Sequence, residues 1–164
     1  MCKITLRQIV MVVGTAALSV FIITKVSSMG FLGKLCMFSS VEGIVLQNGE
    51  PVAEAVVTRE YEWQDTKKSD QTVTDASGKF SFKPRFEYSL LSVIIPHNPV
   101  VLQDITIGVN GDSFEAWSFQ KGNYKLDGEL QGKKLKMTCE LSSEPDLHEL
   151  SALIRYYGLC KLEL

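Results

Sequence analysis

The chain begins with a segment that a small globular domain would have difficulty burying. Residues 8–24 are 17 consecutive uncharged residues, and apolar side chains occupy every face of the helix they would form. Such a helix is about 26 Å long, close to the hydrocarbon thickness of a bilayer, about 30 Å. Lys3 and Arg7 precede the segment, so the positive-inside rule keeps the N-terminus in the cytoplasm. The sequence therefore predicts a single-pass signal anchor (a transmembrane helix) over residues 1–25 in the inner membrane, with the rest in the periplasm or another extracytoplasmic space.

Three other interpretations of this segment stay open. It could be a cleaved signal peptide, because the small residues Val26, Ser28 and Gly30 follow it. It could be a buried core helix, or translation could begin at Met29 or Met37 and leave a soluble domain. With an anchor in place, residues 26–40 are predicted to be a juxtamembrane linker on the bilayer surface.

Charge is divided unevenly along the chain. All 19 Asp and Glu residues lie beyond residue 40, whereas four of the 17 Lys and Arg residues lie before it. Residues 41–164 therefore carry 13 basic and 19 acidic residues, a net charge of −6. Nucleic-acid binding is not expected, because it needs a basic surface that displaces counterions from phosphates. An acidic domain suits a basic protein partner instead.

Beyond residue 40 the pattern is one of short β-rich segments separated by turn residues. Asn48-Gly49 and Asn110-Gly111 are strong turn signals, and 79–83 alternates apolar with polar residues. We expect strands over 41–47, 55–63, 72–74, 79–83, 90–95, 100–109, 114–119 and 135–141, with 64–70 a polar loop. Residues 90–95 are apolar on both faces, which indicates a central strand covered on both sides. The regular spacing predicts a mostly β fold, an Ig-like β-sandwich, over 41–164.

The C-terminal quarter carries one helical signal and two cysteines. Leu147, Leu150, Ile154 and Tyr157 recur at helical spacing after Pro145, which predicts one short C-terminal helix followed by a terminal strand over 159–164. That strand would bring Cys160 near Cys139. An extracytoplasmic compartment permits a disulfide between them, and two buried free thiols are the alternative. No cysteine pair has the C-x-x-C spacing of a zinc or redox site.

Three segments in order resemble a known group of sandwiches: Val41-Glu42-Gly43-Ile44-Val45, then 48–57 with Asn48-Gly49-Glu50-Pro51-Val52, then Thr74-Asp75-Ala76-Ser77-Gly78-Lys79-Phe80-Ser81-Phe82. They are similar to the carboxypeptidase-regulatory-like and Cna-B-like (transthyretin-type) domains. The resemblance implies a transthyretin-type sandwich, here within a family of small bacterial membrane-anchored proteins, and a binding or spacer role. The lysine-to-asparagine isopeptide bond of some members is not expected, because the first strand has no lysine.

Signals of catalysis and of cofactor binding are absent from the sequence. There is no G-x-S-x-G elbow, phosphate-binding glycine loop or dinucleotide fingerprint. His97 and His148 lie in distant segments, so no metal site is predicted, and Glu60, Glu62 and Asp65 are better interpreted as a solvated loop. We therefore expect no enzyme activity and no cofactor, and a small-molecule substrate is not expected.

Aromatic residues beside turns are the candidates for a binding interface, because Trp and Tyr bury large areas and keep a polar group. The interface candidates are Tyr61, Trp63, Asp65, Trp117, Lys121 and Tyr124. A core position is the favoured alternative for Trp117. The function expected from the sequence is a non-catalytic, membrane-anchored binding module, in one version an immunity protein that neutralises a basic secreted antibacterial toxin. The alternative is a structural or spacer subunit of a cell-envelope complex.

Overall fold

The structure is a computed structural model that describes residues 33–152 and 154–163. The predicted transmembrane helix over 8–24 and the first part of the predicted linker lie outside these residues. Within the described ranges, every helix is too short or too polar to cross a bilayer. The described residues fall into two compact units. One contains residues 33–34 and 88–96, and the other contains 35–87 and the described residues from 97 onward.

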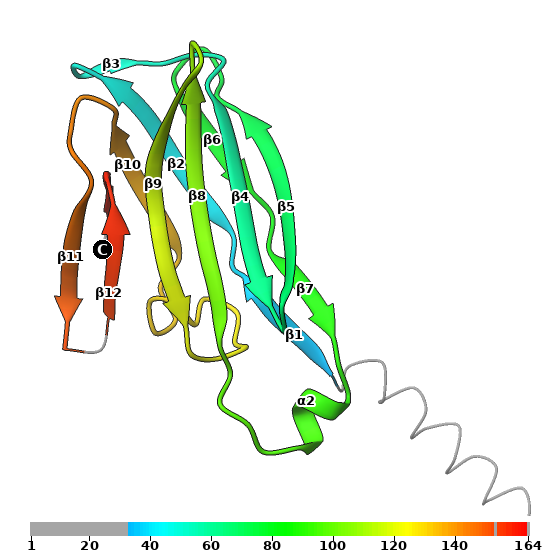
Figure 1. The fold of residues 1–164 in the computed structure, drawn as a ribbon. Helices are drawn as coiled ribbons and strands as arrows, with labels where there is room; N and C mark the ends of the chain where they lie inside the picture. The colour runs from blue at the N-terminus through cyan, green and yellow to red at the C-terminus, as the bar shows by residue number, and fades with distance from the viewer. Residues whose placement is uncertain (1–32, 153, 164) are drawn as a thin grey trace, which may run out of the picture. The chain divides into compact units, whose positions relative to one another are not determined.

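The second unit is almost entirely β-structure (Figure 1). In chain order the elements of both units are β1 (Lys34–Phe38), β2 (Val41–Gln47), β3 (Glu50–Pro51), β4 (Val56–Trp63), β5 (Thr66–Val73), β6 (Lys79–Phe82), β7 (Arg85–Tyr88), α2 (Leu91–Ile94), β8 (Val101–Val109), β9 (Asp112–Lys121), β10 (Leu135–Glu140), β11 (Asp146–Ser151), β12 (Ile154–Gly158) and β13 (Cys160–Leu162). The mostly β, sandwich-like architecture expected from the spacing of the turns is confirmed.

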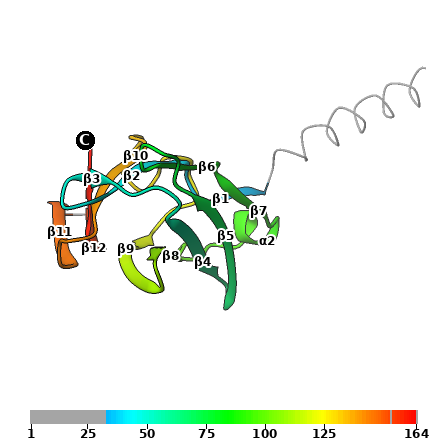
Figure 2. The same ribbon diagram turned by 90° about the horizontal axis from the view of Figure 1, so that it is seen from above.

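Two sheets form the layers of the sandwich (Figure 2). The six-stranded sheet has the order β11-β12-β9-β8-β4-β5, and the five-stranded sheet has the order β13-β10-β2-β3, with β6 also paired to β2. β1 and β7 form a separate two-stranded sheet. Strands β2 and β10 pair in parallel although Glu42 and its partner Lys136 lie 94 residues apart in the sequence. This pairing therefore forms only when the chain between them has folded back on itself.

The core lies between the two layers and draws side chains from both. Val41, Val45 and Met137 of the five-stranded sheet face Val57 and Ile107 of the six-stranded sheet in one buried cluster. Burial alternates along β4, β8 and β10, as expected for strands with one face on the core. Phe80 and Phe82 point inward from β6, as the alternation of residues 79–83 predicts.

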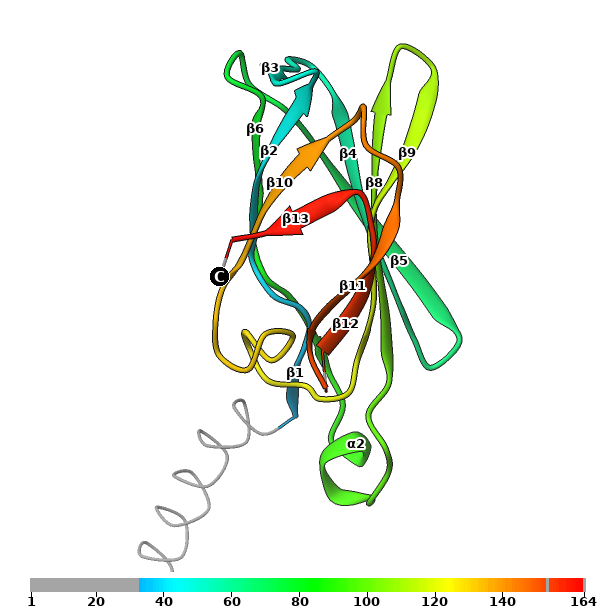
Figure 3. The ribbon, with the colours of Figure 1, turned by 90° about the vertical axis from the view of Figure 1, so that its left-hand side faces the viewer.

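The predicted disulfide is present. Cys139 on β10 and Cys160 on β13 are directly opposite each other in an antiparallel pair and are bonded. Figure 3 shows β13 crossing beside β10 at this edge of the sheet. Closure of a loop of about 20 residues stabilises the fold by about 3 kcal/mol in the chain-entropy treatment.

Four predictions about individual elements are wrong. The expected helix after Pro145 is the hairpin β11–β12, in which Leu147 pairs with Tyr157. Local periodicity is overruled here because Tyr156 of β12 stacks on the core side chain Trp117, with ring centroids 4.5 Å apart. The expected loop over 64–70 is mostly strand β5, because the turn needs only Gln64 and Asp65.

The other two errors concern apolar segments. Leu91–Ile94, within the segment 90–95, form the short helix α2, with Leu91 and Ile94 exposed. An apolar run without alternation does not by itself distinguish a strand from a helix. The sandwich also begins earlier than residue 41. Residues 35–38 of β1, which we assigned to the linker, are buried in the core.

Candidate functional site

Two of the predicted interface residues meet in one aromatic cluster, which we call the Trp63 cluster: Trp63, His97 and Tyr124. The Trp63 indole Nε1–H donates a hydrogen bond to the Tyr124 hydroxyl oxygen at 3.0 Å. His97 Nε2 lies 2.8 Å from the same oxygen. The Trp63 and Tyr124 rings meet edge to face with centroids 6.2 Å apart. Segments before β8, after β9 and at the end of β4 therefore converge on one hydroxyl group.

A second set of polar contacts lies next to this cluster. The Tyr61 hydroxyl donates to Glu87 Oε1, and Lys68 Nζ lies 2.6 Å from the same oxygen. Burial and the hydrogen bond to Glu87 both raise the pKa of Tyr61. Burial alone would raise the pKa of Glu87, but hydrogen bonds from Lys68 and Tyr61 lower it overall. Glu87 is therefore held as a carboxylate and Tyr61 as a neutral phenol at neutral pH.

A small hollow of about 130 Å³ opens between these groups. Its lining residues are Tyr61, Trp63, Gln64, Thr66, Lys68 and Glu87. Sites for small molecules usually have volumes of about 300–1,000 Å³. The hollow is therefore suited to a single side chain from a partner rather than to a whole metabolite.

The β4–β5 hairpin positions this site. Trp63 and Thr66 are cross-strand partners, and Gln64 and Asp65 between them have φ values of 50° and 58°. Two consecutive residues with positive φ form the type I′ turn that matches the twist of the strands. Asp65 is exposed at the tip of the hairpin, beside the hollow, where a partner could contact it.

The remaining two interface candidates lie elsewhere. Trp117 is completely buried and packs on Tyr156 and Phe119, which agrees with the core alternative. Lys121 is also completely buried, and its ammonium group lies 3.0 Å from the Glu129 carboxylate. Neither side chain can contact a partner from this position, so we withdraw both as interface residues.

Sequence reasoning missed His97, Glu87 and Lys68 as parts of the site. His97 lies between two prolines, which favours a solvated turn, and Glu87 and Lys68 belong to ordinary charged strands. Only the folded arrangement brings Glu87 of β7 to Lys68 of β5. No local signal in the sequence would have identified this contact.

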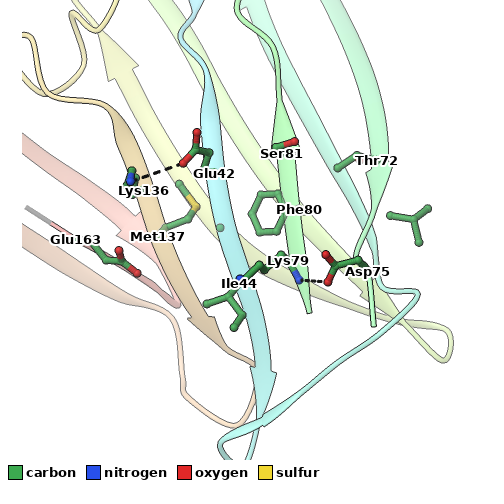
Figure 4. Close-up of a pocket in the computed structure, with 12 residues that line it drawn as sticks. Glu42, Ile44, Thr72, Asp75, Lys79, Phe80, Ser81, Lys136, Met137 and Glu163 are labelled. Carbon is green, nitrogen blue, oxygen red and sulfur yellow. Dashed lines mark hydrogen bonds and ion pairs between the residues drawn. The ribbon is translucent and has the colours of Figure 1, made fainter. Parts of the chain in front are cut away.

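A larger groove of about 630 Å³ lies over β2, β6 and β10 (Figure 4). Within it, Lys136 Nζ lies 3.7 Å from a Glu42 carboxylate oxygen, and the Asp75 carboxylate accepts a hydrogen bond from the Lys79 backbone N–H. The Phe80 ring occupies the space above Gly43, where a Cβ atom would lie 2.5 Å from the ring. The groove collects none of the predicted interface residues.

The chemistry available at the Trp63 cluster is recognition through aromatic area and hydrogen bonds. His97 and Glu87 are held by phenol hydroxyl groups of different tyrosines. Among residues 33–152 and 154–163, no group of three or more His, Cys, Asp and Glu side chains is arranged to hold a metal ion.

The fold and this surface define a small, mostly β, sandwich-like domain. The chain belongs to the family described as Domain of unknown function (DUF6795), which matches residues 41–144, more than half of the sequence. Comparisons with curated proteins and with solved structures gave no match.

Proposed function

We propose that this DUF6795 protein is a non-catalytic, membrane-anchored binding module that engages a protein partner through the surface around the Trp63 cluster. One observation carries the proposal. Trp63 and Tyr124, chosen from the sequence as interface candidates, converge beside a hollow that suits one side chain, and the third candidate, Tyr61, is largely buried and lines this hollow. Exposed Asp65 extends this surface to the tip of the hairpin. Aromatic residues with a polar group beside a small pocket are typical of interface hot spots.

The proposed location is the inner membrane, with residues 8–24 as the single span and the sandwich in the periplasm. The charge before the apolar segment and the Cys139–Cys160 disulfide both support this arrangement. A closer relation to the carboxypeptidase-regulatory-like and Cna-B-like sandwiches also belongs to the proposal. It is supported by the three sequence segments that resemble them.

The partner we favour is a basic secreted toxin, which would make the protein an immunity protein. The net charge of −6 on residues 41–164 supports a basic partner, because opposite charges accelerate encounter. Deletion of the gene is expected to make cells sensitive to neighbouring toxin-secreting kin. Full resistance of the deletion strain would exclude the immunity role and leave binding itself to be tested separately.

In-cell photocrosslinking tests the binding surface. A benzophenone amino acid at Thr66, the first residue of β5 after the Gln64–Asp65 turn, should yield a discrete protein adduct of the full-length chain. The matched control is Ser113, an exposed residue just after the Asn110–Gly111 turn of the β8–β9 hairpin. Adducts at both positions with the same envelope proteins would favour the spacer role. A Thr66 variant that yields no adduct in cells exposed to the toxin would contradict the proposed surface.

A further inference from the structure

The segment between β7 and β8 exposes large apolar side chains. Tyr88, Leu91 and Ile94 are 67%, 69% and 73% exposed, and Leu90 and Ile95 are about half exposed. Together these five residues form what we call the α2 loop surface, around the helix labelled α2 in Figure 1. A group of large, exposed apolar side chains on a protein surface commonly marks a site of interaction with a protein or a membrane.

The sequence around this surface is free of formal charge. Residues 88–103 contain no Asp, Glu, Lys or Arg, whereas Glu87 and Asp104 flank the run on either side. The backbone of the loop also satisfies part of its own hydrogen-bonding capacity. The Ile94 and Ile95 N–H groups donate to the Leu90 and Leu91 carbonyl oxygens at 3.2 and 2.8 Å. Both features lower the cost of transferring the segment out of water.

The α2 loop surface is also hydrogen-bonded to Gly33, which belongs to the predicted juxtamembrane linker. The Ser89 N–H donates to the Gly33 carbonyl oxygen at 2.9 Å. Gly33 has a φ of 101°, and a Cβ atom there would lie 3.3 Å from a methyl group of Leu90. Gly33 follows Thr24, the last residue of the uncharged run, by nine residues, which reach at most about 32 Å. In the proposed arrangement, the chain length therefore keeps Gly33 within about 32 Å of the end of the predicted span.

We propose that the α2 loop surface inserts into the headgroup and acyl boundary of the bilayer in which residues 8–24 are anchored. This inference rests on the membrane attachment in the proposed function. Tyr88 suits the interface because its ring combines apolar area with a hydroxyl group, and Leu91 and Ile94 supply the inserted area. A lipid surface is favoured over a protein partner because the loop is uncharged and because Ser89 is hydrogen-bonded to Gly33, in the predicted juxtamembrane linker.

Lipid quenching of a fluorescent label tests the inference. Full-length protein with Cys2→Ser and Leu91→Cys, labelled with nitrobenzoxadiazole, is reconstituted into vesicles of phosphatidylethanolamine and phosphatidylglycerol that carry acyl-brominated lipid. Labelling is selective because Cys36 is buried and Cys139 and Cys160 are bonded. The matched control carries the label at Asp112→Cys, which is exposed on the β8–β9 hairpin. We expect several-fold stronger quenching at residue 91 than at residue 112, and a loss of that difference when Ile94→Asp is added.

The outcomes separate this inference from the anchor. Protein that resists alkaline carbonate extraction but shows equal quenching at residues 91 and 112 overturns the α2 loop proposal and leaves a protein partner as the occupant. Protein that carbonate removes overturns the anchor. In that case the same label is measured after fresh vesicles are added to the released protein. Quenching at residue 91 alone still supports insertion, and its absence overturns it.

Discussion

The interior of the sandwich and the α2 loop surface each contain side chains that are unusual for their position, charged groups in the interior and large apolar groups on the surface. Inside the sandwich, Arg59 is 1% exposed and Lys121 and Glu129 are buried with it. In the segment 88–96, Leu91 and Ile94 are the most exposed large apolar side chains of the described residues. These buried charges and these exposed apolar side chains are two exceptions to the usual distribution, and they have different explanations.

The buried charges are satisfied within the chain. Glu129 accepts hydrogen bonds from the Ser39 backbone and hydroxyl, from Gln103 and from Lys121, at 2.5 to 3.0 Å. Burial alone would raise the pKa of Glu129, but Lys121 and these hydrogen bonds lower it overall. The exposed apolar side chains lack such coverage by the chain. The buried charges are therefore part of the folded core, whereas the exposed apolar residues are available to a surface outside the molecule.

The largest expected effect comes from breaking the buried ion pair. Lys121→Met should lower the free energy of unfolding by about 3–5 kcal/mol, because Glu129 then remains buried without its cation. The double variant Lys121→Met, Glu129→Leu should recover part of this loss, since no unpaired charge is left. Urea unfolding followed by Trp fluorescence measures both. A single variant as stable as the double variant would contradict this role for the pair.

A smaller effect is expected at Arg59, whose guanidinium donates to both Asp70 carboxylate oxygens at 2.9 and 2.8 Å and to the Lys83 carbonyl oxygen at 2.9 Å. It also lies over the Phe82 ring, 4.5 Å from the centroid. Arg59→Lys keeps the charge but loses the planar fork, at a cost of about 2 kcal/mol in unfolding free energy.

Arg85→Lys is the matched control for Arg59, because Arg85 pairs with the same carboxylate but is half exposed. A surface ion pair contributes at most about 1 kcal/mol. Chemical denaturation of the two variants side by side decides the point. Equal losses for Arg59→Lys and Arg85→Lys would show that burial of the guanidinium adds nothing.

The sequence predicts the local features of the fold better than the features that depend on contacts between distant segments. Strict alternation over 79–83 correctly places Phe80 and Phe82 in the core, and Asn110-Gly111 correctly marks the β8–β9 turn. The pairing of Cys139 with Cys160 also follows from the expected strands. These features depend on short-range sequence patterns, and the folded structure retains the strands and turns that those patterns predict.

Features that depend on distant partners were not predictable. Lys121 lies beyond the strand expected over 114–119, where a lysine is usually solvated, and only the approach of Glu129 and Ser39 makes its burial favourable. The aromatic residues of the site were recognised by residue type, but His97 and Glu87 join it through contacts across the fold. The β11–β12 hairpin likewise depends on Tyr156 packing against Trp117.

Glu140 is a partly exposed charged residue that, like the buried ion pair, has a structural role. Its carboxylate accepts hydrogen bonds from the Ser142 hydroxyl and from the Gly49 and Asn48 N–H groups, which lower its pKa from 4.5 to about 2. A depressed carboxyl pKa stabilises the fold above pH 4.5, and this contribution is lost as the pH falls toward 2.

Glu140→Gln should therefore be less stable than the parent at pH 7, and the difference should shrink steadily between pH 5 and pH 2. Denaturant midpoints across this pH range measure the effect. Glu50→Gln, an exposed glutamate of β3 close to the same turn, is the control and should leave the pH profile of stability unchanged. A difference between Glu140→Gln and the parent that stays constant with pH would contradict the assignment.

The smallest effect on stability is expected at the exposed apolar side chains of the α2 loop surface. Ile94→Ala should change the free energy of unfolding by no more than about 0.5 kcal/mol, because its side chain is 73% exposed. Ile107→Ala, the same substitution at a fully buried position of β8, should cost about 2–5 kcal/mol. Thermal and urea unfolding of the two variants test this directly. A large loss for Ile94→Ala would mean that residue 94 is covered within the folded chain, and the argument that it faces a bilayer would fail with it.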